Sequence, residues 1–182
     1  KGGVTFVQIR EKEASYDEFK KIALDVKKVT DKYNVPMIIN DNVELAKDID
    51  ADGVHVGGDD MSVANARKIL GDNKIIGATA RTYERAVTAV SQGADYLGIG
   101  AMFDTSTKSG TTHMTKELSN KITSYANIPV VGIGGINSEN IMSLEGYGID
   151  GVAVVSAIFK SEEIEKSAKI MKEKASKIVR ES

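Results

Sequence analysis

The hydrophobic positions of this chain fall into short, nearly continuous runs that are separated by longer segments with helical spacing. Seven runs rich in β-branched residues occur, at 4–10, 36–41, 53–58, 74–80, 95–101, 128–135 and 151–157. Strands that are apolar on both faces are typical of a parallel sheet covered by helices. The pattern therefore predicts seven parallel strands with helices between them.

Two of the expected helices carry clear signals. The first begins with the Ser-x-x-Glu spacing of a capping box, at Ser15 and Glu18. Its expected apolar face consists of Phe19, Ile22, Ala23, Val26 and Val29. The last helix is expected from near Ser161, with an apolar stripe formed by Ile164, Ala168, Met171, Ala175 and Ile178. Because no Pro- or Gly-rich linker interrupts the alternation, residues 1–182 are expected to form a single α/β domain.

A weak internal repeat supports a repeating β-α architecture. Residues 51–56, 94–99 and 149–154 each place an aspartate at the turn from a helix into a strand. We interpret these aspartates as turn residues, because Asp favours such turns. Their recurrence indicates that one structural unit is copied along the chain, as in a barrel.

The strand count decides between two α/β architectures. A (β/α)8 barrel needs eight strands, and the chain opens with a segment that resembles a helix end entering a strand. We therefore expect a (β/α)8 barrel whose first strand and helix are missing from this sequence. The alternative is a seven-stranded doubly wound sheet, although residues 132–137 (GIGGIN) lack the G-x-G-x-x-G spacing of dinucleotide folds. An incomplete barrel exposes two strand edges, so association with another chain is expected.

Composition excludes several classes of protein. The formal net charge of -2 offers no basic surface for nucleic acid, and no apolar run approaches the roughly 20 residues that span a bilayer. The absence of Cys excludes disulfides and thiolate metal sites, and together with the lack of a visible signal peptide it favours a cytoplasmic location. With two His in all, a bound metal needs oxygen ligands, which points to Mg²⁺.

Candidate site residues lie at the carboxyl ends of the predicted strands, where barrel enzymes place their reactive groups. In chain order they are Gln8, Arg10, Lys12, Asn40, Asp41, Asp60, Thr79, Thr105, Ser106, Thr107, Lys108, Gly135, Val155 and Ser156. Cationic, carboxylate and hydroxyl side chains and flexible backbone are thus all expected at the end of the barrel where the strands have their carboxyl ends. We call this end the rim. Asp41 and Asp60 end successive strands, and two neighbouring carboxylates repel unless a metal or proton lies between them. They are candidate Mg²⁺ ligands, with simple capping of the following helices as the alternative.

Two further groups of rim residues are suited to binding anions. Thr105, Ser106, Thr107 and Lys108 offer hydroxyl donors and one positive charge, whereas 109–112 can be a plain loop. Gly135, Val155 and Ser156 follow the last two strands, where barrels frequently bind phosphate through backbone N–H groups. Of the two histidines, His55 is expected to pack within a strand and His113 to be solvated.

Seven motifs in order resemble the thiamine-phosphate synthase family: VQIREK, IINDN, ADGVHVGGDD, IIGATA, ADYLGIGAMFDTSTK, PVVGIGGI and GVAVVSAI. The resemblance implies a (β/α)8 barrel that joins hydroxymethylpyrimidine diphosphate to hydroxyethylthiazole phosphate and releases diphosphate. It also implies roles for the rim residues. Gln8, Arg10, Lys12, Asn40, Thr79 and Lys108 would hold the pyrimidine diphosphate, Asp41 and Asp60 would hold Mg²⁺, and Thr105, Ser106, Thr107, Gly135, Val155 and Ser156 would hold the thiazole phosphate. Arg10, Lys12 and Lys108 would stabilise the leaving diphosphate.

The chain departs from the family pattern at three positions. Gly58 stands where the family usually has Gln, Thr79 where it usually has Ser, and Ala101 where it usually has Pro. Two other functions remain open. One is a thiazole tautomerase-like enzyme, whose acid–base His is missing from residues 100–103 of this chain. The other is a non-catalytic, phosphate-binding barrel remnant.

Overall fold

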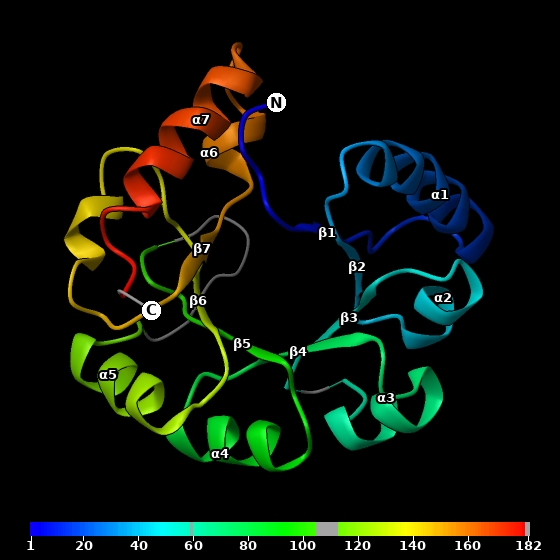
Figure 1. Ribbon diagram of the computed structural model, residues 1–182, viewed down its shortest axis with the longest axis horizontal. Coiled ribbons are helices and arrows are strands. Elements are labelled where there is room, and N and C mark those ends of the chain that lie inside the picture. The colour runs from blue at the N-terminus through cyan, green and yellow to red at the C-terminus, as the bar shows by residue number, and fades with distance from the viewer. Residues whose placement is uncertain (59, 105–112, 181–182) are drawn as a thin grey trace.

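All seven strands form one parallel sheet in which each strand pairs with the next one along the chain. The computed structural model describes residues 1–58, 60–104 and 113–180. The strands are β1 (Val7–Ile9), β2 (Met37–Asn40), β3 (Gly53–Val56), β4 (Ile75–Thr79), β5 (Tyr96–Ile99), β6 (Val130–Ile133) and β7 (Gly151–Ala153). Their order in the sheet is β1-β2-β3-β4-β5-β6-β7. Figure 1 shows that the sheet curls and that the helices lie on its outer side.

The sequential strand order decides between the two predicted architectures. A doubly wound sheet reverses its strand order at a switch point, and this sheet has no reversal. The doubly wound alternative is therefore wrong, and the expectation of an incomplete barrel is confirmed. In the described part of the chain, β1 and β7 are the two edges of the sheet.

Helices connect the strands in the predicted places. They are α1 (Tyr16–Lys32), α2 (Val43–Asp48), α3 (Val63–Leu70), α4 (Tyr83–Ser91), α5 (Lys116–Tyr125), the 3-10 helix η1 (Ile141–Leu144), α6 (Ser156–Phe159) and α7 (Ile164–Ala175). The capping box of α1 is confirmed, because Ser15 and Glu18 bond reciprocally. None of the described helices is long and apolar enough to cross a membrane.

Three sequence predictions need correction. Ile164, placed in the apolar stripe of the last helix, is 48% exposed at the start of α7 (Ile164–Ala175). The run 151–157 is a strand only as far as Ala153, and Ser156 begins the short helix α6 instead. On α1, Phe19 and Ala23 are buried as predicted, but Ile22 and Val29 are 44% and 56% exposed. The reason is that α1 packs against β2 near the β1 edge of the sheet, so that only one narrow side of the helix meets the core.

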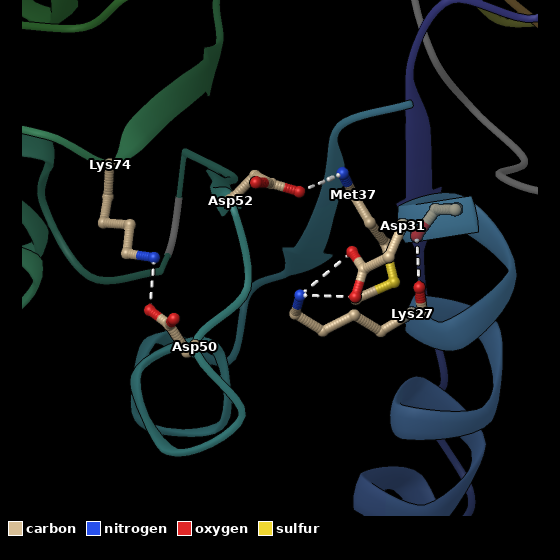
Figure 2. Close-up of polar contacts among 7 residues, drawn as sticks. Lys27, Asp31, Met37, Asp50, Asp52 and Lys74 are labelled. Carbon is tan, nitrogen blue, oxygen red and sulfur yellow. Dashed lines mark hydrogen bonds and ion pairs between the residues drawn. The ribbon is translucent and has the colours of Figure 1, made fainter. Parts of the chain in front are cut away.

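The three repeated aspartates connect neighbouring strands, a role that goes beyond turn formation. Each carboxylate accepts a backbone hydrogen bond of 2.7 Å from the start of the preceding strand: Asp52 from Met37, Asp95 from Ile76 and Asp150 from Val130. Figure 2 shows the Asp52–Met37 bond. The bonds satisfy buried N–H groups that would otherwise cost free energy. The repeated aspartates therefore link β2 to β3, β4 to β5 and β6 to β7 through hydrogen bonds.

Candidate active site

The parallel strands bring the predicted site residues to one end of the sheet. Gln8 lies within β1, Arg10 and Lys12 follow it, and Asn40 and Thr79 are the last residues of β2 and β4. Asp41 follows β2 directly, Asp60 lies in the turn after β3, Gly135 follows β6, and Val155 and Ser156 form the start of α6. Thr105, Ser106, Thr107 and Lys108 lie outside the described residues, and their roles stay predictions.

Asp41 and Asp60 bring their carboxyl groups together. Asp41 has a φ of 64°, in the left-handed region, and its N–H donates to the His55 carbonyl at 2.8 Å. Burial raises the pKa of the Asp41 carboxyl, and a hydrogen bond with Asp60 and repulsion from its charge raise it further. The positive charges of Arg10 and Lys12 act in the opposite direction. The arrangement is a pair of carboxylates that repel each other, with two cations nearby.

The turn after β3 fixes Asp60 in this position. The Gly57 N–H donates to Asp60 Oδ2 at 2.7 Å, and a β-carbon at position 57 would collide with that same oxygen. A residue larger than glycine at position 57 would therefore displace the Asp60 carboxylate. The same hypothetical β-carbon would lie 3.8 Å from Asp41 Oδ1, so this turn touches both carboxylates.

The donor set at this point of the rim fits a divalent cation. Carboxylate oxygens are the ligands that Mg²⁺ prefers, and a cation between Asp41 and Asp60 would relieve the repulsion that raises the Asp41 pKa. No cluster of three or more His, Asp or Glu side chains suited to a metal occurs within the described ranges. Two protein carboxylates with remaining positions left to substrate phosphate are typical of magnesium sites.

Arg85 of α4 reaches the same turn. A β-carbon at position 58 would coincide with the Arg85 Nη1 atom, and the three atoms nearest to it all belong to the Arg85 guanidinium. The guanidinium thus lies in the space that a longer residue 58 would fill. Sequence reasoning missed this relationship, since 27 positions separate the two residues. They meet because α4 packs against β4, the strand that pairs with β3.

Inside the curled sheet, His55 joins two other polar side chains. Its Nδ1 lies 2.7 Å from the Tyr96 hydroxyl and its Nε2 lies 2.9 Å from Thr79 Oγ1. Burial raises the pKa of the Tyr96 phenol, and a hydrogen bond with the Gln8 side chain opposes this shift. His55 is 5% exposed, as expected of a packing residue, but both of its ring nitrogens are engaged. Thr79, a predicted substrate ligand, is thereby bonded to the His55 ring.

The loops after β5 and β6 approach each other closely. Gly134 and Gly135 have φ values of 92° and 69°, and a β-carbon at position 135 would lie 2.8 Å from the Phe103 carbonyl carbon. The Gly135 carbonyl accepts a hydrogen bond of 2.9 Å from Asn140 Nδ2. His113, expected to be solvated, is half-exposed and lies 3.0 Å from Asp104. Gly135 therefore adjoins the segment that leads into the predicted hydroxyl-rich loop.

Val155 and Ser156 complete the rim beside Gly135. They lie at the start of α6, and β7 pairs with β6 so that the two loops are neighbours. The side chain of Val155 is 73% exposed. The first N–H groups of a helix have no partner within the helix, so those at the start of α6 are candidate phosphate ligands.

Comparison with known proteins places this architecture in a family. The family model described as thiamine monophosphate synthase matches residues 1–158. The thiamine-phosphate synthase of Clostridium botulinum is 48% identical over 97% of this chain and 83% of its own length. That of Ruminiclostridium cellulolyticum is 52% identical over 92% of this chain and 80% of its own length.

Solved structures agree with this assignment. The thiamine phosphate pyrophosphorylase of Pyrococcus furiosus superposes with a TM-score of 0.89 at 35% identity, covering 98% of this chain and 86% of that one. A 3-hexulose-6-phosphate synthase, at 16% identity and a TM-score of 0.70 over 94% of this chain and 87% of its own, shares the fold alone. The chain belongs to the thiamine monophosphate synthase family.

Proposed function

We propose that this protein joins hydroxymethylpyrimidine diphosphate to hydroxyethylthiazole phosphate with release of diphosphate. The observation that carries the proposal is the identity of 48% with a curated thiamine-phosphate synthase over 97% of the chain. The carboxylates and cations at the carboxyl ends of β1, β2 and β3 suit a diphosphate substrate. The relatives are named as synthases, which favours this reaction over that of a thiazole tautomerase.

The reaction needs stabilisation of the departing diphosphate and does not need a general base. The bond between the pyrimidine methylene carbon and the diphosphate oxygen breaks, and the electron pair leaves with the diphosphate. The thiazole nitrogen then donates its lone pair to the methylene carbon, which forms the new C–N bond. Because the attacking nitrogen carries no proton, no general base is required.

Different residues of the rim would bind the two substrates, and the first group would bind the diphosphate. Arg10 and Lys12 lie near the carboxylate pair and would bind diphosphate oxygens, together with Lys108. Asp41 and Asp60 would hold Mg²⁺, which when bound supplies positive charge to the departing diphosphate. Catalysis here consists of positioning and electrostatic stabilisation.

The thiazole phosphate is assigned to the opposite part of the rim. The backbone around Gly135 and the start of α6, at Val155 and Ser156, would bind its phosphate through N–H groups, with hydroxyls from Thr105, Ser106 and Thr107. The adjacency of β6 and β7 supports this assignment.

Mass spectrometry of a complete reaction mixture tests the function. The protein is incubated with both substrates and Mg²⁺, and thiamine phosphate and diphosphate are expected in equal amounts. Omission of either substrate, or an excess of EDTA, should abolish the product. A chain that binds both substrates but makes no thiamine phosphate would support the phosphate-binding remnant instead.

We also propose that the chain associates with itself. In the described residues, β1 pairs only with β2 and β7 pairs only with β6. Edge strands present unpaired N–H and C=O groups that template pairing with another chain. Size-exclusion chromatography with light scattering should give a mass above that of a single chain, and a monomer at all concentrations would contradict the proposal.

A further inference from the structure

One side chain bonds to the backbone on both sides of Ile136, in the loop that follows β6. Asn140 Nδ2 donates to the Gly135 carbonyl at 2.9 Å, and Asn140 Oδ1 accepts from the Asn137 N–H at 2.8 Å. These partners determine which way the amide points, because a carbonyl needs a donor and an N–H needs an acceptor. We refer to this pair of hydrogen bonds as the Asn140 bridge.

The Asn140 bridge fixes the direction of the peptide group between Gly135 and Ile136. A peptide group is planar and trans, so its C=O and its N–H point in opposite directions. Since the Gly135 carbonyl points toward the Asn140 amide, the Ile136 N–H points away from it. The side chain of Ile136 is 4% exposed, so core packing restrains the same residue.

The backbone before Ile136 is permissive and depends on such contacts. Gly134 and Gly135 have φ values of 92° and 69°, and glycine adopts more backbone conformations than any other residue. The Gly134 carbonyl accepts from the Phe103 N–H at 3.1 Å, and the Gly135 carbonyl accepts from Asn140. Two successive peptide groups of the turn are thus held by their carbonyl oxygens.

Asn140 is itself held firmly. It precedes the 3-10 helix η1, in which Ile141 and Leu144 are 0% and 1% exposed. Its N–H donates to Asn137 Oδ1 at 3.2 Å, and its carbonyl accepts from Ser143 Oγ at 2.8 Å. The Asn140 bridge therefore connects the glycine turn to residues that are anchored in the core.

We propose that Asn140 is a positioning residue for the binding of a phosphate monoester at the rim. It acts through the Gly135 carbonyl and keeps the N–H groups of the glycine turn directed at the phosphate. The proposal rests on the proposed function, which assigns the thiazole phosphate to the backbone around Gly135. A binding group that is already held in its bound orientation loses less conformational freedom when the ligand arrives.

Asn140→Asp and Asn137→Asp are a matched pair of variants. Each replaces an amide with a carboxylate in the same loop. Asn140→Asp loses the donor to the Gly135 carbonyl and keeps an acceptor for the Asn137 N–H. Asn137→Asp keeps its own bonds, because Asn137 Oδ1 accepts from the N–H groups of Glu139 and Asn140. The pair therefore separates loss of the bridge from the added negative charge.

NMR titration with hydroxyethylthiazole phosphate measures the effect without turnover. In the wild type, the amide signals of Gly135 and Ile136 should shift on binding. In Asn140→Asp the dissociation constant should rise at least about tenfold, as expected when a hydrogen bond to a charged group is weakened. In Asn137→Asp it should stay within about threefold of the wild type, because salt screens exposed charges. Inorganic phosphate, which shares only the phosphate group, should rank the three proteins in the same order.

Steady-state kinetics distinguish positioning from a general loss of structure. Asn140→Asp should raise the KM for thiazole phosphate at least about tenfold. Its kcat and its KM for the pyrimidine diphosphate should stay within about threefold of the wild type, the pattern of a lost binding interaction. A variant that is merely damaged would lose kcat and bind both substrates poorly.

The outcomes also separate this role from the proposed function. Wild-type affinity for phosphate in Asn140→Asp would overturn the role of Asn140, and so would equal weakening in Asn137→Asp. Wild-type Gly135 and Ile136 signals that do not respond to inorganic phosphate would overturn it as well. Asn140→Ala removes the bridge without adding charge, and it replaces Asn140→Asp if that variant does not fold. The expected ranking for inorganic phosphate supports the role of Asn140 even if no thiamine phosphate forms, a failure that would count against the proposed function alone.

Discussion

The guanidinium of Arg85 occupies the space that a side chain at position 58 would need. The resemblance to the family implies Gln at the position of Gly58. In this chain the Arg85 guanidinium lies where that side chain would begin, beside the turn that holds Asp60. The two positions should therefore be energetically coupled, although they lie 27 residues apart.

Gly58→Gln should lower kcat/KM, because two long side chains then compete for one place beside Asp60. Since the end of an arginine is flexible, the free energy of unfolding should change by less than about 1 kcal/mol. The double variant Gly58→Gln/Arg85→Ala should recover most of the lost kcat/KM. A double-mutant cycle measures the coupling. Arg81 replaces Arg85 in the control cycle, and strictly additive effects in both cycles would contradict the relationship.

Asp41→Asn and Asp60→Asn should each lower kcat by at least about a hundredfold and leave the fold intact, because the departing diphosphate loses compensating charge. Asn is chosen at position 41 because it tolerates the φ of 64°. Steady-state rates over a range of Mg²⁺ concentrations and circular dichroism check the prediction. Asp31→Asn, which alters an exposed ion pair on α1, is the control. Near-normal rates at low Mg²⁺ in either site variant would refute the carboxylate assignment.

The raised pKa of Asp41 predicts how stability depends on pH in the absence of metal. A carboxyl whose pKa is raised in the folded protein binds its proton more tightly there than in the unfolded chain. Its stabilising contribution is therefore complete below the unfolded pKa of about 3.9 and is lost as the pH rises through the higher folded value. Asp41→Asn removes the penalty and should melt above the wild type at neutral pH in EDTA.

Thermal melts from about pH 4 to pH 7 measure this difference. It should widen as the pH rises, and added Mg²⁺ should narrow it by raising the melting temperature of the wild type alone. A constant difference across the range would mean that Asp41 ionises normally. An equal effect of Mg²⁺ on both proteins would mean that the ion binds elsewhere.

Lys108→Ala should lower kcat by about a hundredfold while the KM for thiazole phosphate stays near the wild-type value. The resemblance assigns Lys108 to the diphosphate, whose negative charge becomes localised as the C–O bond breaks. Interactions that strengthen in the transition state appear in kcat. Steady-state kinetics with each substrate varied in turn are the measurement. A raised KM for thiazole phosphate with unchanged kcat would assign Lys108 to the other substrate.

The sequence by itself determined the seven strands, the capping box of α1 and the placement of Asp41 and Asp60 at one edge of the sheet. Burial on both faces of β2 requires a continuous apolar run such as Met37 to Ile39, and the capping box at Ser15 depends on residues three positions apart. Parallel strands place their carboxyl ends at one edge, so Asp41 and Asp60 could be predicted as neighbours. These features follow from local periodicity and from one topological rule, and both are visible along the chain.

Only the tertiary structure decided which distant side chains meet. His55 could be predicted to be buried, but its bonds to Thr79 and Tyr96 span 24 and 41 positions and depend on the register of three strands. The repeated aspartates could be predicted as turn residues, yet their bonds to the preceding strands depend on where each turn crosses its neighbour. Arg85 meets Gly58 because α4 packs against β4, the neighbour of β3 in the sheet, and because glycine leaves the space open. Such contacts depend on the register of the strands, the packing of the helices and the rotamers of the side chains. Local sequence patterns reveal none of these three.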